Sequence, residues 1–185
     1  PKFNISKSQR KMDVSQRILA ASEWNAFIEA MLNLPETNYL ERAHKTRLRF
    51  IVTTLYFLGL RCEELANLNW RDFVQIDDYW LVRVNGKGRT SEVESDVVLC
   101  SSHYLKEVSY YREFLKLCDL SANNEDQPVL FSLISGKPLT ASNIRRLIKA
   151  HAKLVSQTFD TDSASFKKMQ RLSPHWLRHL CASQL

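Results

Sequence analysis

The hydrophobic pattern of this chain changes period at Tyr79, and that change limits the folds that the sequence can adopt. Before it, apolar residues recur at helical spacing, as in "SEWNAFIEAML", where Trp24, Phe27 and Met31 share one face. From Tyr79 to Leu99 apolar and polar residues alternate around the turn "NGKG", which is typical of a β-hairpin. Helical spacing returns after Leu99. The sequence therefore predicts an α+β fold, mainly helical, with a small antiparallel β-sheet.

Capping residues bound several of the predicted helices. Ser22 precedes the first helix and Pro35 ends it, while Gly59 suits the left-handed conformation that stops the second. Leu154 is predicted to lie on the buried stripe of a later helix, and residues 156–171 have the composition of a loop. The expected helices are 22–34, 40–58, 61–70, 103–117, 140–156 and the segment from 173, and "VLF" at 129–131 is a predicted short strand.

Composition indicates one globular domain with a basic arm. The chain has 185 residues, of which 44% are apolar and 25% charged, so it can build a sizeable core. Residues 1–17 are polar and basic and are predicted to be a linker or arm that follows an upstream segment, whereas 18–185 form the folded domain. Lysine and arginine outnumber acidic residues 26 to 20, which favours a polyanionic partner.

The four cysteines lie far apart without a C-x-x-C pair, so neither a zinc site nor a disulfide framework is indicated. The longest apolar run, "FIVTTLYFLGL", is too short to span a membrane. No signal peptide is evident. We therefore expect a protein of the bacterial cytoplasm that binds no membrane, needs no cofactor and holds no metal.

Cationic side chains occur at three places that the pattern predicts to be rigidly supported. Arg61 lies at a helix start, Lys87 at the hairpin tip, and His175 and Arg178 share one face at the start of the last helix. Each has an ordinary explanation on its own. Arg61 can form an ion pair with Glu64 at i+3, a lysine in a turn aids solubility, and His and Arg three residues apart occur on many solvated helices.

Together and in this order, these segments resemble a known family. "LYFLGLRCEELANLNWRDF" resembles the first arginine box of the tyrosine recombinases, the phage integrase family. "VNGKGRTSEVESDVVL" resembles their lysine hairpin, and "LSPHWLRHLCASQL" resembles their H-x-x-R box. The resemblance covers the chain from about Arg17 onward, and it implies a core-binding domain upstream that the arm 1–17 would join to the catalytic domain, residues 18–185. It implies a site-specific recombinase that acts in DNA integration and recombination, as the enzymes of phages and other mobile elements do.

The resemblance also implies roles for individual residues. Arg61 and Arg178 correspond to the arginines that clamp the scissile phosphate, a task that suits planar, permanently charged groups. Lys87 corresponds to the general acid for the leaving 5′ oxygen, and His175 to the histidine that positions the phosphate and manages the proton of the nucleophile. Glu64 corresponds to an acidic residue that supports the first arginine and the histidine.

Further residues are expected to support the site or to bind DNA. His179 matches a common family residue and is interpreted as support rather than as a catalytic group. A basic helix face is predicted to follow the DNA backbone. The residues expected to bind DNA are Arg89, Arg145, Arg146 and Lys149.

The position of the tyrosines departs from the family pattern. The family nucleophile is a tyrosine that follows the H-x-x-R box, but all six tyrosines here precede His175. We therefore expect that the catalytic domain is cut short before the nucleophile and that this fragment is inactive alone. We expect double-stranded DNA and other recombinase protomers, as a tetramer on DNA, to be its partners.

Three alternative functions stay open at this point. A type IB topoisomerase uses similar arginine, lysine and tyrosine chemistry, but it relaxes supercoils without exchanging strands. A degenerate family member would only bind DNA as a regulator. A basic helical protein with no DNA role is the third, and tight, salt-dependent DNA binding would argue against it.

Overall fold

The computed structural model describes residues 18–84, 96–120 and 126–182, and for Cys181 and Ala182 only the backbone. The predicted arm 1–17, Lys87 and Arg89 lie outside the described residues. The helices are α1 (Ala21–Leu32), α2 (Tyr39–Leu58), α3 (Cys62–Ala66), the 3-10 turn η3 (Trp70–Asp72), α4 (Ser102–Phe114), α5 (Ala141–Ser156), α6 (Ala164–Arg171) and α7 (Pro174–Ala182). The strands are β1 (Phe73–Ile76), β2 (Tyr79–Val84) and β3 (Asp96–Leu99). The predicted α+β fold with a small antiparallel sheet is confirmed.

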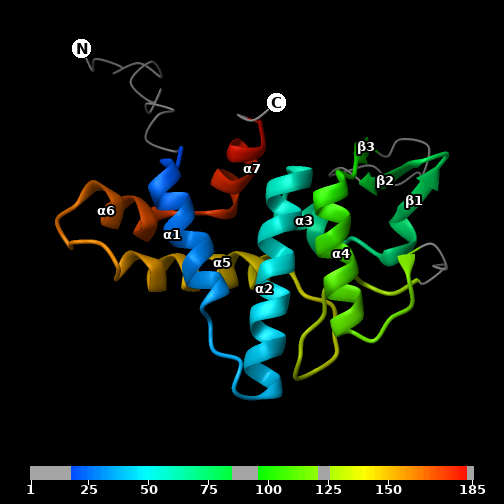
Figure 1. Ribbon diagram of the computed structural model, residues 1–185, viewed down its shortest axis with the longest axis horizontal. Coiled ribbons are helices and arrows are strands. Elements are labelled where there is room, and N and C mark those ends of the chain that lie inside the picture. Colours follow the sequence, from blue (N-terminus) through cyan, green and yellow to red (C-terminus); the bar gives the residue numbers. More distant parts are fainter. Residues whose placement is uncertain (1–17, 85–95, 121–125, 183–185) are drawn as a thin grey trace, which may run out of the picture.

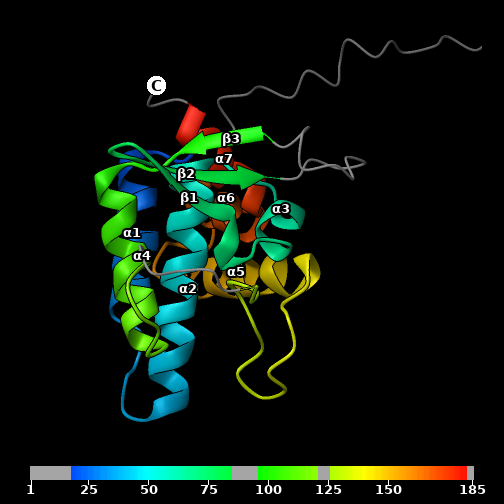
Figure 2. The same ribbon diagram turned by 90° about the vertical axis from the view of Figure 1, so that its right-hand side faces the viewer.

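The long helix α2 is the centre of the fold (Figure 1). Helices α1, α4 and α7 pack against it, and the sheet lies beyond α4. Helix α5 runs across the other helices and contacts α1, α3 and α6. In Figure 2, α3, the first turns of α5 and the loop before α5 lie toward the same side of the molecule.

The end of α2 sets the position of Arg61. Asn38 caps the start of α2 by accepting a 3.0 Å hydrogen bond from the Glu41 N–H. Gly59 ends the helix with φ of 60°, in the left-handed region that glycine adopts without steric cost. Only two residues, Leu60 and Arg61, then separate Gly59 from α3, so the chain turns sharply.

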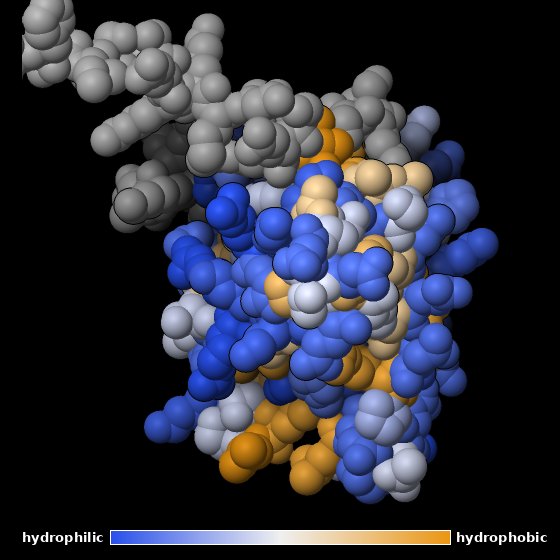
Figure 3. All heavy atoms as spheres, turned by 90° about the vertical axis from the view of Figure 1, so that its left-hand side faces the viewer, coloured by the Kyte–Doolittle hydropathy of each residue, from blue (hydrophilic) through white to orange (hydrophobic). Residues whose placement is uncertain are grey.

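Hydrophilic residues dominate the face formed by α1 and α6, as Figure 3 shows. Lys167 and Arg171 are exposed on α6, while Met169 of the same helix is buried. Helix α6 therefore covers the core with one side chain and presents charge to solvent. Within the described residues, no helix is both long and apolar enough to cross a membrane.

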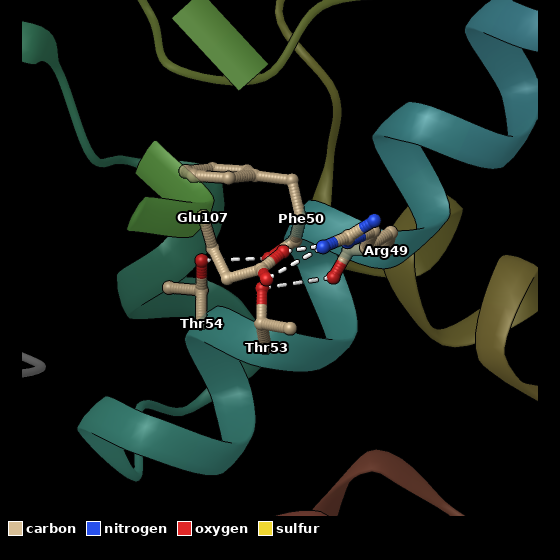
Figure 4. Close-up of polar contacts among 5 residues, drawn as sticks. All are labelled: Arg49, Phe50, Thr53, Thr54 and Glu107. Carbon is tan, nitrogen blue, oxygen red and sulfur yellow. Dashed lines mark hydrogen bonds and ion pairs between the residues drawn. The ribbon is translucent and has the colours of Figure 1, made fainter. Parts of the chain in front are cut away.

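An ion pair joins α2 to α4 (Figure 4). Arg49 donates from Nε and Nη2 to the two carboxylate oxygens of Glu107, at 2.6 and 2.7 Å. Further along α2, the Thr54 hydroxyl donates to the Phe50 carbonyl and lies 3.0 Å from the Tyr104 hydroxyl. The ring of Phe50 stacks on Tyr111 of α4 with centroids 4.2 Å apart. Polar and aromatic contacts thus hold α2 and α4 together along one interface.

The sheet has three antiparallel strands in the order β1-β2-β3. The predicted hairpin is present as β2 and β3, which pair from Leu81 with Leu99 to Val84 with Asp96. The first strand, Phe73–Ile76, was not predicted because it has only four residues, of which Phe73 alone is buried. The connection that carries Lys87 therefore joins two paired strands.

Five expectations about individual segments are wrong. Ser22 does not precede the first helix, because α1 begins at Ala21 after its N-cap Ala20, and the helix expected at 61–70 ends at Ala66. Residues 156–171 are not all loop, because Ser163 caps α6 by accepting a bond from the Phe166 N–H. The segment 129–131 joins no sheet, and only an isolated bridge pairs Phe131 with Pro138. Leu154 is 46% exposed because it lies on the outer side of α5, away from Ile148.

Candidate phosphate-binding site

Arg61 is held at the surface by buried neighbours on both sides. Leu60 and Cys62 are 3% and 6% exposed, whereas the Arg61 side chain is 56% exposed. Arg61 is also the N-cap residue of α3, with φ and ψ of −79° and 156°. Its guanidinium therefore projects from a backbone whose flanking residues are anchored in the core.

The Glu64 carboxylate binds Arg61 twice and faces Arg178. Glu64 Oε2 accepts a 2.7 Å bond from the Arg61 backbone N–H, and Oε1 accepts a 2.6 Å bond from Arg61 Nη1. Arg178 Nη1 lies 3.7 Å from Glu64 Oε2. The Glu64 side chain is only 8% exposed, so one largely buried carboxylate holds two guanidiniums near each other.

Helix α7 brings the second arginine and two histidines to this place. The helix packs against α2 and begins at Pro174, as the sequence predicts. Arg178 is 35% exposed and His175 is exposed, one turn before it. The His179 ring lies edge-on to the His175 ring with centroids 4.5 Å apart, so His179 can restrict the orientation of His175.

A pocket of about 310 Å³ opens beside these residues. Arg61 and His175 line it, and α5 adds Arg145 and Lys149. An acidic residue, Glu63, also lines the pocket and forms an ion pair with Arg145. The four cationic or titratable donors and the single paired carboxylate favour an anionic ligand.

Two of the pocket residues were missed by the sequence analysis. Glu63 is exposed on the first turn of α3, where nothing but its position beside Glu64 indicated a role. Cys62 lines the pocket, and burial raises the pKa of its thiol to about 11. The thiol therefore stays protonated at neutral pH and is no nucleophile. The described residues contain no cluster of three or more potential metal ligands.

The structure places three of the residues expected to bind DNA in two different pockets. Arg145 and Lys149 line the pocket, but Arg146, the next residue after Arg145, lines a different pocket on the other side of α5. Rotation by about 100° per residue separates neighbouring helical side chains in this way. Arg89, with Lys87, lies outside the described residues.

The sequence of residues 18–185 matches the family described as the phage integrase family. The chain belongs to the phage integrase family. The tyrosine recombinase XerD of Chlamydia trachomatis serovar D is 30% identical over 168 residues, which are 91% of this chain and 48% of that protein. A tyrosine recombinase of Agathobacter rectalis is 31% identical over 153 residues, 81% of this chain and 42% of the relative. The chain thus spans about half the length of the curated integrase-family relatives it matches.

Solved recombinase structures share the fold of this integrase-family chain. The XerH site-specific recombinase, in a pre-cleavage complex with its difH substrate, superposes with a TM-score of 0.58 at 19% identity. That match covers 91% of this chain and 42% of XerH. The XerA recombinase gives a TM-score of 0.57 at 22% identity, over 90% of this chain and 49% of XerA. These matches support the fold.

Proposed function

We propose that this chain carries the phosphate-binding part of a site-specific DNA recombinase that cuts and rejoins DNA through a 3′-phosphotyrosyl intermediate. One observation carries the proposal: Arg61 and Arg178 meet at the Glu64 carboxylate beside a cationic pocket. The two arginines are 117 positions apart in the sequence (178 − 61), so their approach is a property of the fold. Membership of the phage integrase family adds support from the sequence.

The chemistry proposed for the site is stabilisation of charge on phosphorus. Two guanidiniums offer planar forks of N–H donors to the non-bridging oxygens of the scissile phosphate. Their attraction to these oxygens becomes stronger as negative charge develops in the transition state. Glu64 keeps Arg61 and Arg178 in place before DNA arrives, which lowers the ordering cost of binding. In this proposal His175 orients the phosphate, and Lys87 protonates the leaving oxygen.

The nucleophile in this proposal comes from outside these 185 residues. All six tyrosines precede His175 in the sequence, and none is among the described side chains that line the pocket. Tyr104 and Tyr111 are buried in the core, where burial raises the pKa of both phenols. We therefore propose that the chain binds DNA but forms no covalent link to it alone.

Double-stranded DNA and further recombinase protomers are the proposed partners. The XerH structures carry titles that describe a site-specific recombinase bound to difH substrate before and after cleavage. The net charge of +6 also favours a polyanion. By extension, we propose that four protomers assemble on two DNA sites when recombination occurs.

The first experiment selects duplexes from a random pool with the 185-residue chain and measures binding of the enriched DNA. We expect one preferred sequence, and we expect the double variant Arg61→Gln/Arg178→Gln to bind it about tenfold or more weakly, because each charge-assisted contact to phosphate is lost. Arg71→Gln/Arg171→Gln is the matched control, since both arginines are exposed and neither lines the pocket.

Nicked suicide duplexes of the enriched sequence then test the chemistry. We expect binding without an adduct that survives denaturation, whereas an adduct formed by the chain alone would contradict the proposed source of the nucleophile. Equal affinities of the two double variants would contradict the phosphate site. Relaxation of supercoiled DNA without strand exchange, once a tyrosine is supplied by a longer reading frame, would favour the topoisomerase alternative instead.

A further inference from the structure

A second pocket lies on the other side of α5. It encloses about 560 Å³ between the start of α2, the turn at 132–137 and the first turns of α5. The loop before α5 and the α3 end of the phosphate-binding site face the same side of the molecule in Figure 2. The polar residues that line this second pocket are Arg47, Ser132, Lys137, Thr140, Asn143 and Arg146.

The second pocket is cationic. Arg47, Lys137 and Arg146 line it, and no carboxylate is among the lining side chains in the described part of the chain. Arg47 is half-buried: its Nη1 donates to the Phe131 carbonyl at 3.4 Å, while its buried Nε has no hydrogen-bond partner. Burial lowers the pKa of Arg47. A partly desolvated cation is costly without a counter-charge, so the pocket favours an anion.

Backbone hydrogen bonds hold the turn at 132–137, which carries Lys137 and forms one wall of the pocket. The Ser132 N–H donates to the Lys137 carbonyl at 2.7 Å, and the Gly136 N–H donates to the Ser132 carbonyl at 2.9 Å. Gly136 has φ of 65°, which closes this turn. The Leu139 N–H donates to the Leu130 carbonyl at 3.0 Å. A ligand therefore meets a preformed wall, which reduces the entropy lost on binding.

Helix α5 connects the two pockets. Arg145 lines the phosphate-binding site, and Arg146, turned by about 100° around the helix, lines the second pocket. A helix with its side chains is about 10–12 Å across, and one DNA strand carries a phosphate about every 3.4 Å of its axis, so several phosphates lie over a span of that size. A duplex that lies over α5 can therefore present phosphates to both pockets.

We propose that the second pocket binds a backbone phosphate of the same DNA duplex, distinct from the phosphate held by Arg61 and Arg178. This inference rests on the proposed function, and it adds Arg47 and Lys137 to the DNA-binding surface. Lys137 and Arg146 bind the phosphate directly, and Arg47 supplies positive charge at the base of the pocket. An acidic segment of another protein is the competing occupant.

The test compares the salt dependence of DNA binding in three forms of the 185-residue chain. Lys137→Gln/Arg146→Gln removes two charges from the pocket and leaves the buried Arg47 intact. Lys106→Gln/Lys167→Gln removes two exposed charges from α4 and α6 as the matched control. Affinity for the enriched duplex is measured over a series of salt concentrations, and thermal melting checks that each form is folded.

We expect the pocket variant to bind about tenfold more weakly and the slope of log affinity against log salt to fall by about 0.9, the value for one lost phosphate contact. The control variant should keep the slope of the unmodified chain. When methylphosphonates are placed one at a time along the enriched duplex, we expect one position to weaken binding by the unmodified chain but not by the pocket variant.

Two results would overturn the inference about the second pocket and still leave the proposed function standing. Equal slopes for both variants, with tight binding by the unmodified chain, would leave the proposed function standing and remove the second phosphate. Binding of a polyglutamate peptide by the unmodified chain but not by the pocket variant, with DNA binding unchanged, would assign the pocket to an acidic protein segment. If the unmodified chain binds no DNA, both the proposed function and this inference fail.

Discussion

Glu64 joins the two arginines of the phosphate-binding site without facing the pocket itself. Its carboxylate accepts bonds from Arg61 and lies near Arg178, so a neutral Gln in its place leaves two like charges close together. We expect Glu64→Gln to lower the free energy of unfolding by about 1–2 kcal/mol. Sulfate should restore more stability to this variant than to the unmodified chain, because the anion binds the exposed arginines.

Urea unfolding with and without sulfate measures both effects. Glu113→Gln, an exposed position on α4, is the control. The proposed role of Glu64 would be refuted by equal losses of stability in the two variants.

At the scale of elements, Glu23 fastens α1 to α6. Its carboxylate accepts bonds from the Ala20 N–H at 2.7 Å, the Ser165 hydroxyl at 2.9 Å and Lys168 Nζ at 2.9 Å. Burial pushes the pKa of Glu23 up, but the hydrogen bonds and the charge of Lys168 outweigh burial and hold it below its ordinary value. Its stabilisation is therefore present above the ordinary glutamate pKa and is lost as the pH falls through the lowered value.

We expect Glu23→Gln to destabilise the protein by about 1–3 kcal/mol at neutral pH, because the partly buried Lys168 loses its counter-charge. Glu29→Gln lies exposed on the same helix and should change stability by less than about 0.5 kcal/mol. Chemical denaturation of both variants checks the prediction. A loss of the same size in both would mean that the contacts with α6 contribute nothing.

At the scale of the whole molecule, a buried histidine ties stability to pH. His151 on α5 lies 2.9 Å from the Phe27 carbonyl of α1 and near His44 of α2. Burial lowers the pKa of His151, although the bond to Phe27 opposes the shift, and burial and Arg47 lower the pKa of His44. The unfolded chain takes up protons near the ordinary histidine pKa of about 6.5, and the folded chain resists them.

Stability should therefore fall as the pH drops from about 7.5 to 5.5, by at most about 1.4 kcal/mol per pH unit for each histidine. His151→Gln keeps a donor for Phe27 but cannot titrate, so we expect a flatter dependence. His103→Gln, exposed on α4, should retain the full slope. Parallel pH profiles for all three forms would contradict this link.

Local features of the fold were predictable, and tertiary ones were not. Gly59 and Pro174 mark helix ends through backbone conformations that depend on a few neighbours, and the structure has both as expected. Helix α6 was missed because it has only eight residues, most of them polar, and one fully buried side chain, Met169. Helix geometry alone turns Arg145 and Arg146 about 100° apart, but the pocket that each one lines depends on the packing of α5 between α3 and the turn at 132–137, which no local pattern contains.

The position of Arg178 near the end of the sequence has a consequence for how such a protein is made. More than half of the chain separates it from Arg61, and the two meet only when α7 packs against α2. A ribosome therefore releases the first arginine long before the second. The emerging chain therefore cannot bring Arg61 and Arg178 together at Glu64 until α7 has been made and packs against α2.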